Sequence, residues 1–159
     1  MSKIDIIIVD DHVLFSEALN SLISKIEEFN VIKVLNNGRE VVNYFLNNNQ
    51  EPDVILMDIQ MPIMNGIEAT NWLKNNKPEI KVLALSMECE ESTILAMLRA
   101  GAKGYLLKDI HPNILHHALN QVNLNGFYYT DNITNTLLNS IHKPEKKKNI
   151  TLKERELEF

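Results

Sequence analysis

The amino-acid sequence predicts an α/β fold in which helices cover both faces of a five-stranded parallel sheet. Short apolar runs bounded by turn residues alternate along the chain with segments whose apolar residues recur every three or four positions. The clearest run is Val54–Met57, where four apolar residues in a row lead to the carboxylate of Asp58. Such a run is typical of a strand buried on both faces, as the central strands of a parallel sheet are.

The remaining elements follow from the same two periodicities. We expect strands at residues 4–9, 31–35, 54–58, 81–86 and 103–107. We expect helices at residues 14–26, 38–46, from 65 onward, 90–100 and 112–124. Asn65 followed by Glu68 predicts a capping box, and Gly101 is the residue expected just past a helix end. The apolar face predicted for the first helix consists of Leu14, Phe15, Ala18, Leu19, Leu22, Ile23 and Ile26.

The second strand is interrupted by Lys33, which indicates an edge strand with one face in water. Right-handed crossovers leave few topologies, and a flavodoxin-like, doubly wound sheet of order 2-1-3-4-5 fits a polar second strand best. A dinucleotide site is disfavoured because no Gly-x-Gly-x-x-Gly follows the first strand. The acidic turn Asp10-Asp11-His12 follows it instead.

Bulk composition narrows the class of protein. The 159 residues suit one compact domain with a remnant, and 45% hydrophobic content is enough for a core. No apolar run approaches membrane-spanning length and the chain starts without a signal peptide, so we expect a cytoplasmic protein. The single Cys89 suits a reducing compartment. A net charge of -5 argues against nucleic-acid binding by bulk electrostatics.

Charged and polar residues stand at four of the predicted strand ends. Asp10 and Asp11 follow the first strand, Asp58 ends the third, Ser86 the fourth, and Lys108 follows the fifth. In the order 2-1-3-4-5 these strands are neighbours, so the side chains should converge on one edge. Clustered carboxylates repel unless a cation relieves them, and oxygen-only ligands favour Mg²⁺. The set predicts a phosphoryl acceptor with Asp58 as nucleophile.

These residues resemble the receiver domain of bacterial two-component response regulators. The resemblance rests on the acid pair, on Asp-x-x-Met-Pro-x-Met-Asn-Gly from Asp58, and on the Ser and Lys that follow in order. It implies that a histidine kinase phosphorylates Asp58 and that Ser86 and Lys108 contact the phosphoryl oxygens. Leu106-Leu107-Lys108-Asp109 is similar to the same region of the NarL/LuxR-type transcription factors.

The resemblance also implies a metal site and a switch. Mg²⁺ would be held by Asp11, Asp58 and the backbone carbonyl of Gln60, with Asp10 acting through water. Ser86 and Tyr105 would form the switch, although a strand Tyr is equally typical of a plain core residue. Met87 departs from the small residue usual after Ser86 and is expected to narrow access to Asp58.

The end of the chain predicts two further segments. Residues 1–124 form the expected receiver, and residues 125–149 a linker with a short helix, because Ile133, Leu137 and Ile141 recur every four residues. Residues 150–159 resemble the start of a LuxR-type helix-turn-helix, truncated before its recognition helix. The full-length protein would then bind promoter DNA and form a homodimer on phosphorylation.

Two other functions stay open at the level of sequence. A stand-alone receiver could act through protein contacts, and an aspartyl-phosphate hydrolase of the haloacid dehalogenase kind would need Asp-x-Asp after the first strand, where this chain has adjacent acids. We therefore expect a regulatory phosphoacceptor rather than an enzyme. Surface roles, not metal binding, are expected of the five histidines, His12, His111, His116, His117 and His142.

Overall fold

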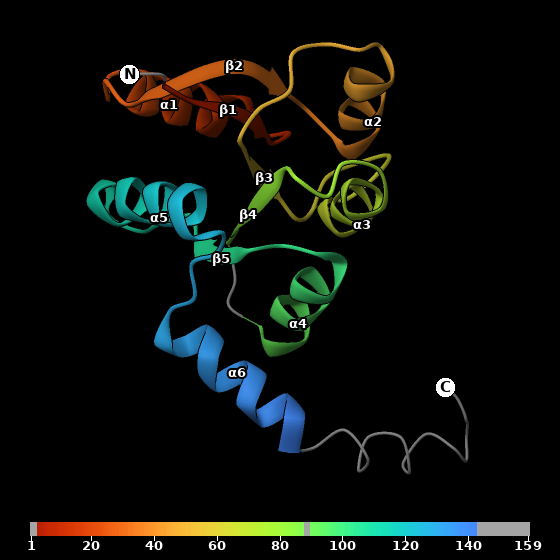
Figure 1. Ribbon diagram of the computed structural model, residues 1–159, viewed down its shortest axis with the longest axis vertical. Coiled ribbons are helices and arrows are strands. Elements are labelled where there is room, and N and C mark those ends of the chain that lie inside the picture. The colour runs from red at the N-terminus through yellow and green to blue at the C-terminus, as the bar shows by residue number, and fades with distance from the viewer. Residues whose placement is uncertain (1–2, 88–89, 143–159) are drawn as a thin grey trace. The chain divides into compact units, whose positions relative to one another are not determined.

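The computed structural model describes residues 3–87 and 90–142, which form five strands and six helices (Figure 1). The strands are β1 (Ile4–Val9), β2 (Phe29–Leu35), β3 (Val54–Asp58), β4 (Lys81–Ser86) and β5 (Gly104–Leu107). The helices are α1 (Val13–Ser24), α2 (Gly38–Leu46), α3 (Gly66–Asn76), α4 (Glu91–Ala100), α5 (Pro112–Asn125) and α6 (Asp131–His142).

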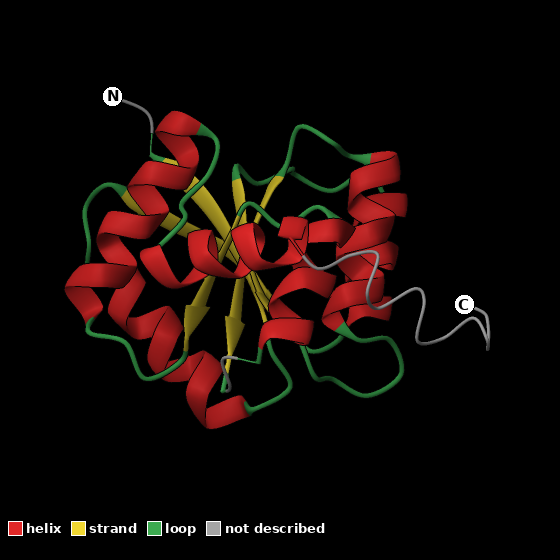
Figure 2. Ribbon diagram, turned by 90° about the horizontal axis from the view of Figure 1, so that it is seen from below, coloured by secondary structure: helices red, strands yellow, loops and turns green. Residues whose placement is uncertain are grey.

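All strands are parallel and lie in the order β2-β1-β3-β4-β5, which confirms the predicted flavodoxin-like topology. Helices α1 and α5 cover one face of the sheet, and α2, α3 and α4 cover the other (Figures 1 and 2). Every residue of β3 is buried, as its apolar run predicted, while Lys33 on β2 is exposed at the sheet edge. The core on the α1 and α5 side is formed by residues of all five strands and of both helices.

The two predicted helix ends, the capping box at Asn65 and the glycine at 101, are confirmed. The Asn65 side chain accepts the backbone N–H of Glu68, and the Glu68 carboxylate accepts that of Asn65, at 2.9 Å in both directions. Gly101 ends α4 in the left-handed region at φ 118°. Several ends shift by one or two residues: β2 begins at Phe29 instead of 31, and α1 ends at Ser24 instead of 26.

The expectation that all apolar residues of α1 face inward is wrong for Leu14 and Ala18. Leu14 is 85% exposed and Ala18 is also exposed, whereas Leu19 and Ile23 are buried. Side chains four apart form rows along a helix, so α1 carries two adjacent apolar rows. The row that begins at Phe15 includes the buried Leu19 and Ile23, whereas in the row that begins at Leu14 only Leu22 and Ile26 pack against the core, and only in part.

The chain separates into two compact units, Met1–Tyr128 and a second that begins at Tyr129. Tyr128 closes the first unit, because its N–H donates to the carbonyl of Lys103 at 2.8 Å and it bridges to Gly104. The first unit thus runs four residues past the predicted receiver boundary at 124, and the domain limits stay predictions. The short helix expected in the linker is confirmed as α6.

Some predictions fall on residues outside the described ranges. These are Cys89, the linker after residue 142 and the helix-turn-helix start at 150–159. Within residues 3–87 and 90–142, none of the helices has the length and apolar character needed to cross a membrane.

Candidate functional site

The carboxyl ends of β1, β3, β4 and β5 meet at one edge of the sheet and bring the predicted residues together. Asp58 and Ser86 are the last residues of β3 and β4, while Asp10 directly follows β1. Asp10, Asp58 and Ser86 are all buried, at 1%, 5% and 7% exposure. Neighbouring parallel strands end at the same edge of a sheet, so the convergence of these residues follows from the strand order.

Lys108 links two of these carboxylates. Its Nζ lies 2.8 Å from Asp10 Oδ2 and 3.2 Å from Asp58 Oδ1, and its side chain is only 5% exposed. The backbone N–H of Lys108 donates to the carbonyl of Ser86 at 2.8 Å, which fixes the residue beside the end of β4. The Phe15 ring of α1 lies 4.7 Å from Nζ, a favourable cation–π arrangement.

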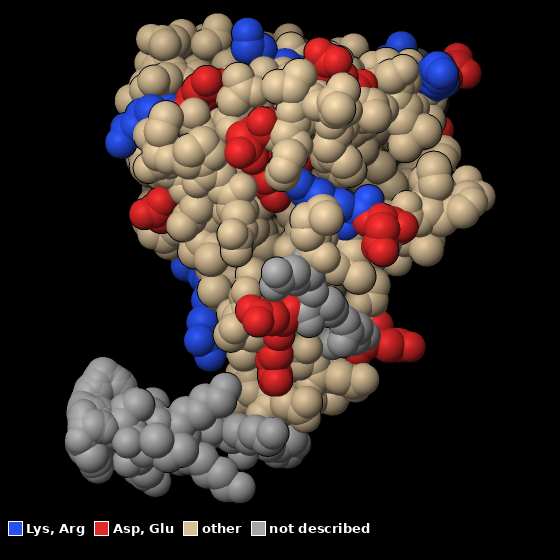
Figure 3. All heavy atoms as spheres, turned by 180° about the vertical axis from the view of Figure 1, so that it is seen from behind, with Lys and Arg blue, Asp and Glu red and all other residues tan. Residues whose placement is uncertain are grey.

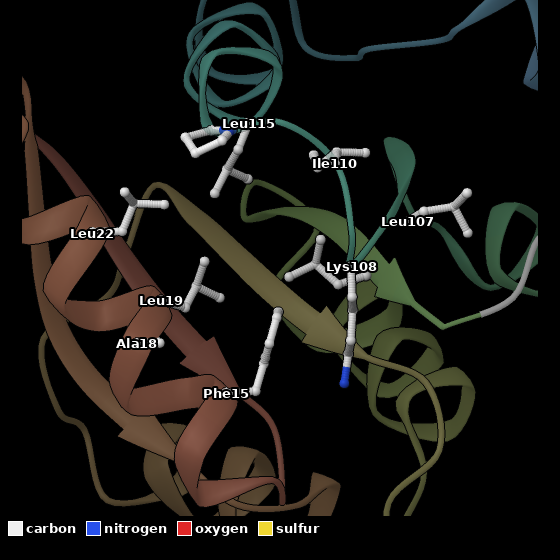
Figure 4. Close-up of a pocket in the computed structure, with 10 residues that line it drawn as sticks. Phe15, Ala18, Leu19, Leu22, Leu107, Lys108, Ile110 and Leu115 are labelled. Carbon is white, nitrogen blue, oxygen red and sulfur yellow. The ribbon is translucent and has the colours of Figure 1, made fainter.

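Figure 4 shows how the Lys108 side chain reaches the site. Its aliphatic stem forms part of the wall of an apolar cavity of about 140 Å³ between α1 and α5. The ammonium group extends beyond this wall next to Phe15, where it contacts Asp10 and Asp58. Because the stem is packed and the charge is buried, the ammonium position is fixed before any substrate arrives.

Asp58 is held with an unusual proton affinity. Burial, and secondarily repulsion by Asp10, raise the pKa of the Asp58 carboxyl to about 6, against the opposing effect of Lys108 and of the Ile59 N–H. That N–H donates to Asp58 Oδ1 at 2.9 Å. The pKa stays raised in spite of the nearby ammonium, because loss of water around the carboxylate and repulsion by Asp10 together outweigh the effect of Lys108.

Asp58 belongs to a group of possible metal ligands. Asp10, Asp11, His12 and Asp58 each offer one atom, and these atoms lie within 4.8 Å of one another. Asp11 Oδ1 is buried and has no hydrogen-bond partner among the described residues. An orphaned carboxylate oxygen beside two other carboxylates fits a hard divalent cation such as Mg²⁺. Three of the four predicted ligand residues are therefore grouped here.

Gln60, the fourth predicted ligand residue, is exposed and lies in the loop that follows β3. It lines two adjoining cavities, of about 240 and about 520 Å³, and the larger one is also lined by Asp11. The smaller cavity reaches Asp58 and is also lined by Ser86, Met87 and Thr93. The Met87 side chain is 75% exposed and lines the cavity beside Asp58, which remains open next to it.

Sequence reasoning missed two residues of this site, His12 and Thr93. His12 directly follows Asp10 and Asp11 in the sequence, and this position next to the acid pair could have indicated that it belongs to the site. Thr93 lies in the first turn of α4, and lines both cavities beside Gln60. Its position depends on how α4 packs, which no local pattern encodes.

The loop after Asp58 is held close to the end of β3 by Gly66. Its N–H donates to the carbonyl of Ile59 at 2.7 Å, and a Cβ at Gly66 would lie 2.1 Å from the carbonyl oxygen of Asp58. No side chain fits there, since contacts under about 3 Å are repulsive. Gly66 therefore lets α3 begin directly against the phosphoacceptor candidate.

The two switch candidates share one face of the sheet. Tyr105 pairs with Ala84, two residues before Ser86, and side chains two apart on a strand point to the same side. Leu85 and Leu106 belong to the core under α1 and α5, so Ser86 and Tyr105 lie on the opposite face, that of α4. Tyr105 is buried, at 3% exposure.

Comparison with known proteins identifies the family. Residues 6–120 match the response regulator receiver domain. The chain is 37% identical over 137 residues to the transcriptional regulatory protein DegU of Brevibacillus brevis, covering 86% of this chain and 57% of that protein. It is 30% identical over 136 residues to the nitrate/nitrite response regulator protein NarL of Escherichia coli K12, covering 86% of this chain and 62% of NarL.

A solved structure gives the same result for the fold. The two-component response regulator of the LuxR family from Aurantimonas sp. SI85-9A1 superposes with a TM-score of 0.77 at 27% identity, covering 89% of this chain and 99% of that chain. The chain spans about 57% and 62% of the lengths of DegU and NarL, respectively. The matches agree with the acidic edge and the buried lysine. The chain therefore belongs to the NarL/LuxR-type two-component response regulators and consists mostly of their receiver domain.

Proposed function

We propose that Asp58 accepts a phosphoryl group from a histidine kinase. The observation that carries this proposal is a buried carboxylate at the end of β3, 3.2 Å from a fixed ammonium and grouped with two further acids. An Asp58 oxygen attacks phosphorus, and the bond from phosphorus to the donor imidazole nitrogen breaks, leaving an acyl phosphate on Asp58. With a pKa of about 6, the Asp58 carboxyl is mostly ionised at neutral pH and can act as the nucleophile.

The neighbouring residues have separate tasks in this proposal. Asp11, Asp58 and the backbone carbonyl of Gln60 would hold Mg²⁺, with Asp10 acting through water, and the cation would supply positive charge near the transferring oxygens. Lys108 supplies a positive charge that is already in place, so it pairs with a phosphoryl oxygen without reorganisation. The Ser86 hydroxyl donates a hydrogen bond to another phosphoryl oxygen.

The signal leaves the site through Ser86 and Tyr105. A phosphoryl group adds roughly -1.5 to -2 charges at neutral pH, and Ser86 moves toward it. Tyr105 then turns into the space on the α4 face of the sheet, shifting the population between two forms of the surface made by α4 and β5. The domain is a regulatory phosphoacceptor whose own chemistry is slow acyl-phosphate hydrolysis.

In this proposal the full-length protein is cytoplasmic, and its phosphorylation controls transcription. The names of DegU, a transcriptional regulatory protein, and NarL, a response regulator, support this reading. DNA contact would belong to a helix-turn-helix domain of the full-length protein, brought to promoter half-sites by homodimers that form on phosphorylation. On the face of the molecule in Figure 3, basic and acidic side chains are scattered among uncharged ones, which does not suit this face for binding DNA phosphates.

Intact-mass spectrometry after incubation with acetyl phosphate and Mg²⁺ tests the phosphoacceptor. We expect one added phosphoryl group on the unmodified chain and none on Asp58→Asn. Asp53→Asn is the matched control, because Asp53 directly precedes the opposite end of the same strand and should leave labelling unchanged. Labelling of Asp58→Asn to the same extent as the unmodified chain would exclude Asp58 as the acceptor.

A further inference from the structure

His12 is the one non-acidic member of the ligand group at the sheet edge. Its Nδ1 lies 3.7 Å from Asp10 Oδ1, and its ligand atom lies within 4.8 Å of those of Asp10, Asp11 and Asp58. Its backbone N–H donates to Asp10 Oδ1 at 2.8 Å, which ties the residue to the acidic turn. The main chain thus keeps His12 next to the carboxylates.

The side chain of His12 has no other structural task among the described residues. His12 is the N-cap residue of α1, where a side chain usually accepts a backbone N–H, yet its ring makes no capping hydrogen bond. The side chain is 69% exposed, so it contributes little to the core. An exposed ring tethered by its backbone can turn toward a cation at small energetic cost.

A divalent cation would balance the charges at this edge. Three carboxylates face one ammonium, that of Lys108, which is already shared between Asp10 and Asp58. Asp11 Oδ1 is buried without a partner in the described part of the chain. An unpartnered carboxylate oxygen of Asp11 and the imidazole of His12, on consecutive residues, can provide one oxygen and one nitrogen ligand for the same ion.

We infer that His12 is an additional metal ligand and that the site prefers divalent transition ions that accept imidazole, such as Mn²⁺, Co²⁺ or Zn²⁺, over Mg²⁺. This inference rests on the proposed cation site at Asp10, Asp11 and Asp58. Mg²⁺ favours oxygen ligands and retains water, so the imidazole adds little to its binding. Transition ions gain from nitrogen ligands, and their affinity for a mixed carboxylate and imidazole site is higher.

The preference would make phosphorylation responsive to the metal that occupies the site. An imidazole in the coordination sphere takes a position that water or a phosphoryl oxygen otherwise fills. The rate of phosphorylation with Mn²⁺ should therefore depend on His12, and the rate with Mg²⁺ should not.

Calorimetry on the full 159-residue chain measures the first consequence. His12→Ala should lower Mn²⁺ affinity by about tenfold or more, on the scale of losses seen when groups around a metal are removed. Its Mg²⁺ affinity should stay within about twofold, which also shows that the variant is folded. His117→Ala is the matched control, since His117 is exposed on α5 and is not among the grouped ligands.

Pulsed electron paramagnetic resonance of bound Mn²⁺ gives a readout independent of activity. We expect ¹⁴N modulation from an imidazole in the unmodified chain and in His117→Ala, and its loss in His12→Ala. Mn²⁺ binding without ¹⁴N modulation, or modulation that persists in His12→Ala, would overturn the role of His12 and leave the proposed function standing. Absence of both Mg²⁺ and Mn²⁺ binding in the unmodified chain would instead overturn the cation site itself.

Discussion

Asp58 is a buried carboxyl group that the folded chain holds at an energetic cost. Its pKa is raised from 3.8 to about 6, mainly by burial and then by Asp10. The folded state therefore binds the proton more strongly than the unfolded state does. The stability of the fold falls as pH rises through the window from about 4 to about 6, because ionised Asp58 is better solvated after unfolding.

Asp58→Asn removes this cost, so the variant should be more stable than the unmodified chain at neutral pH. We expect a gain of roughly 1–3 kcal/mol above pH 6 without divalent cations, since one pKa unit corresponds to about 1.4 kcal/mol. The gain should shrink as the pH falls and approach zero only below about pH 3, where Asp58 is protonated in both states. Urea unfolding at a series of pH values measures the difference.

Divalent cations provide the control for this prediction. At the proposed site Mg²⁺ would bind the ionised carboxylates of the folded chain, so saturating Mg²⁺ should reduce the advantage of Asp58→Asn. A difference in stability that is the same at pH 4 and pH 7 would mean that ionisation of Asp58 does not set the cost.

At the scale of elements, the start of α3 determines the shape of the site. Gly66→Ala places a Cβ where only 2.1 Å separates it from the carbonyl oxygen of Asp58, so α3 or the end of β3 must move. We expect a loss of about 3 kcal/mol or more, at the upper end for overpacking. Phosphorylation of Asp58 should slow as well, because its backbone is displaced.

Gly126→Ala is the matched control for this change. Gly126 ends α5 at φ 92°, and among the described residues nothing lies within 4 Å of an added Cβ. Its cost should be about 1–2 kcal/mol, the strain of a left-handed residue, with unchanged phosphorylation. Urea unfolding measures the stability of both variants, and intact-mass kinetics measures their rate of phosphorylation. Equal effects of Gly66→Ala and Gly126→Ala on phosphorylation would contradict the role of Gly66.

At the scale of the whole molecule, Tyr105 is expected to pass the change at Asp58 to the surface of α4 and β5. Tyr105→Ala should accept the phosphoryl group yet lose the change in hydrogen exchange over residues 90–107 that phosphorylation causes. Leu106→Ala is a control of similar burial, because Leu106 is 3% exposed on the opposite face of the same strand. Both variants lose stability, and a full exchange response in Tyr105→Ala would make Tyr105 a core residue only.

Residues 1–159 should not bind DNA selectively. Its net charge of -5 opposes the phosphate backbone, and charges of both signs are mixed on the face shown in Figure 3. We expect mobility-shift assays at moderate salt to show no sequence-selective retardation by residues 1–159, with or without phosphorylation. Selective retardation would place a DNA-binding surface within this chain.

The sequence by itself determined the sheet order, the caps at Asn65 and Gly101, and the residues at the strand ends. These features depend on patterns within a few positions, such as an apolar run that ends in Asp58 or a cap followed by Glu68. Strand order then followed from general rules on crossovers and from the polar edge strand. Convergence of Asp58, Lys108 and the acid pair required no further information.

Only the tertiary structure decided which apolar row of α1 is buried, how far the pKa of Asp58 rises, and why residue 66 must be glycine. It also placed His12 and Thr93 beside the predicted site. Each of these depends on distances between atoms that are remote in sequence or on the packing angle of a helix. Desolvation, repulsion and steric contact act through space, so a pattern along the chain can indicate the participants but not their separations.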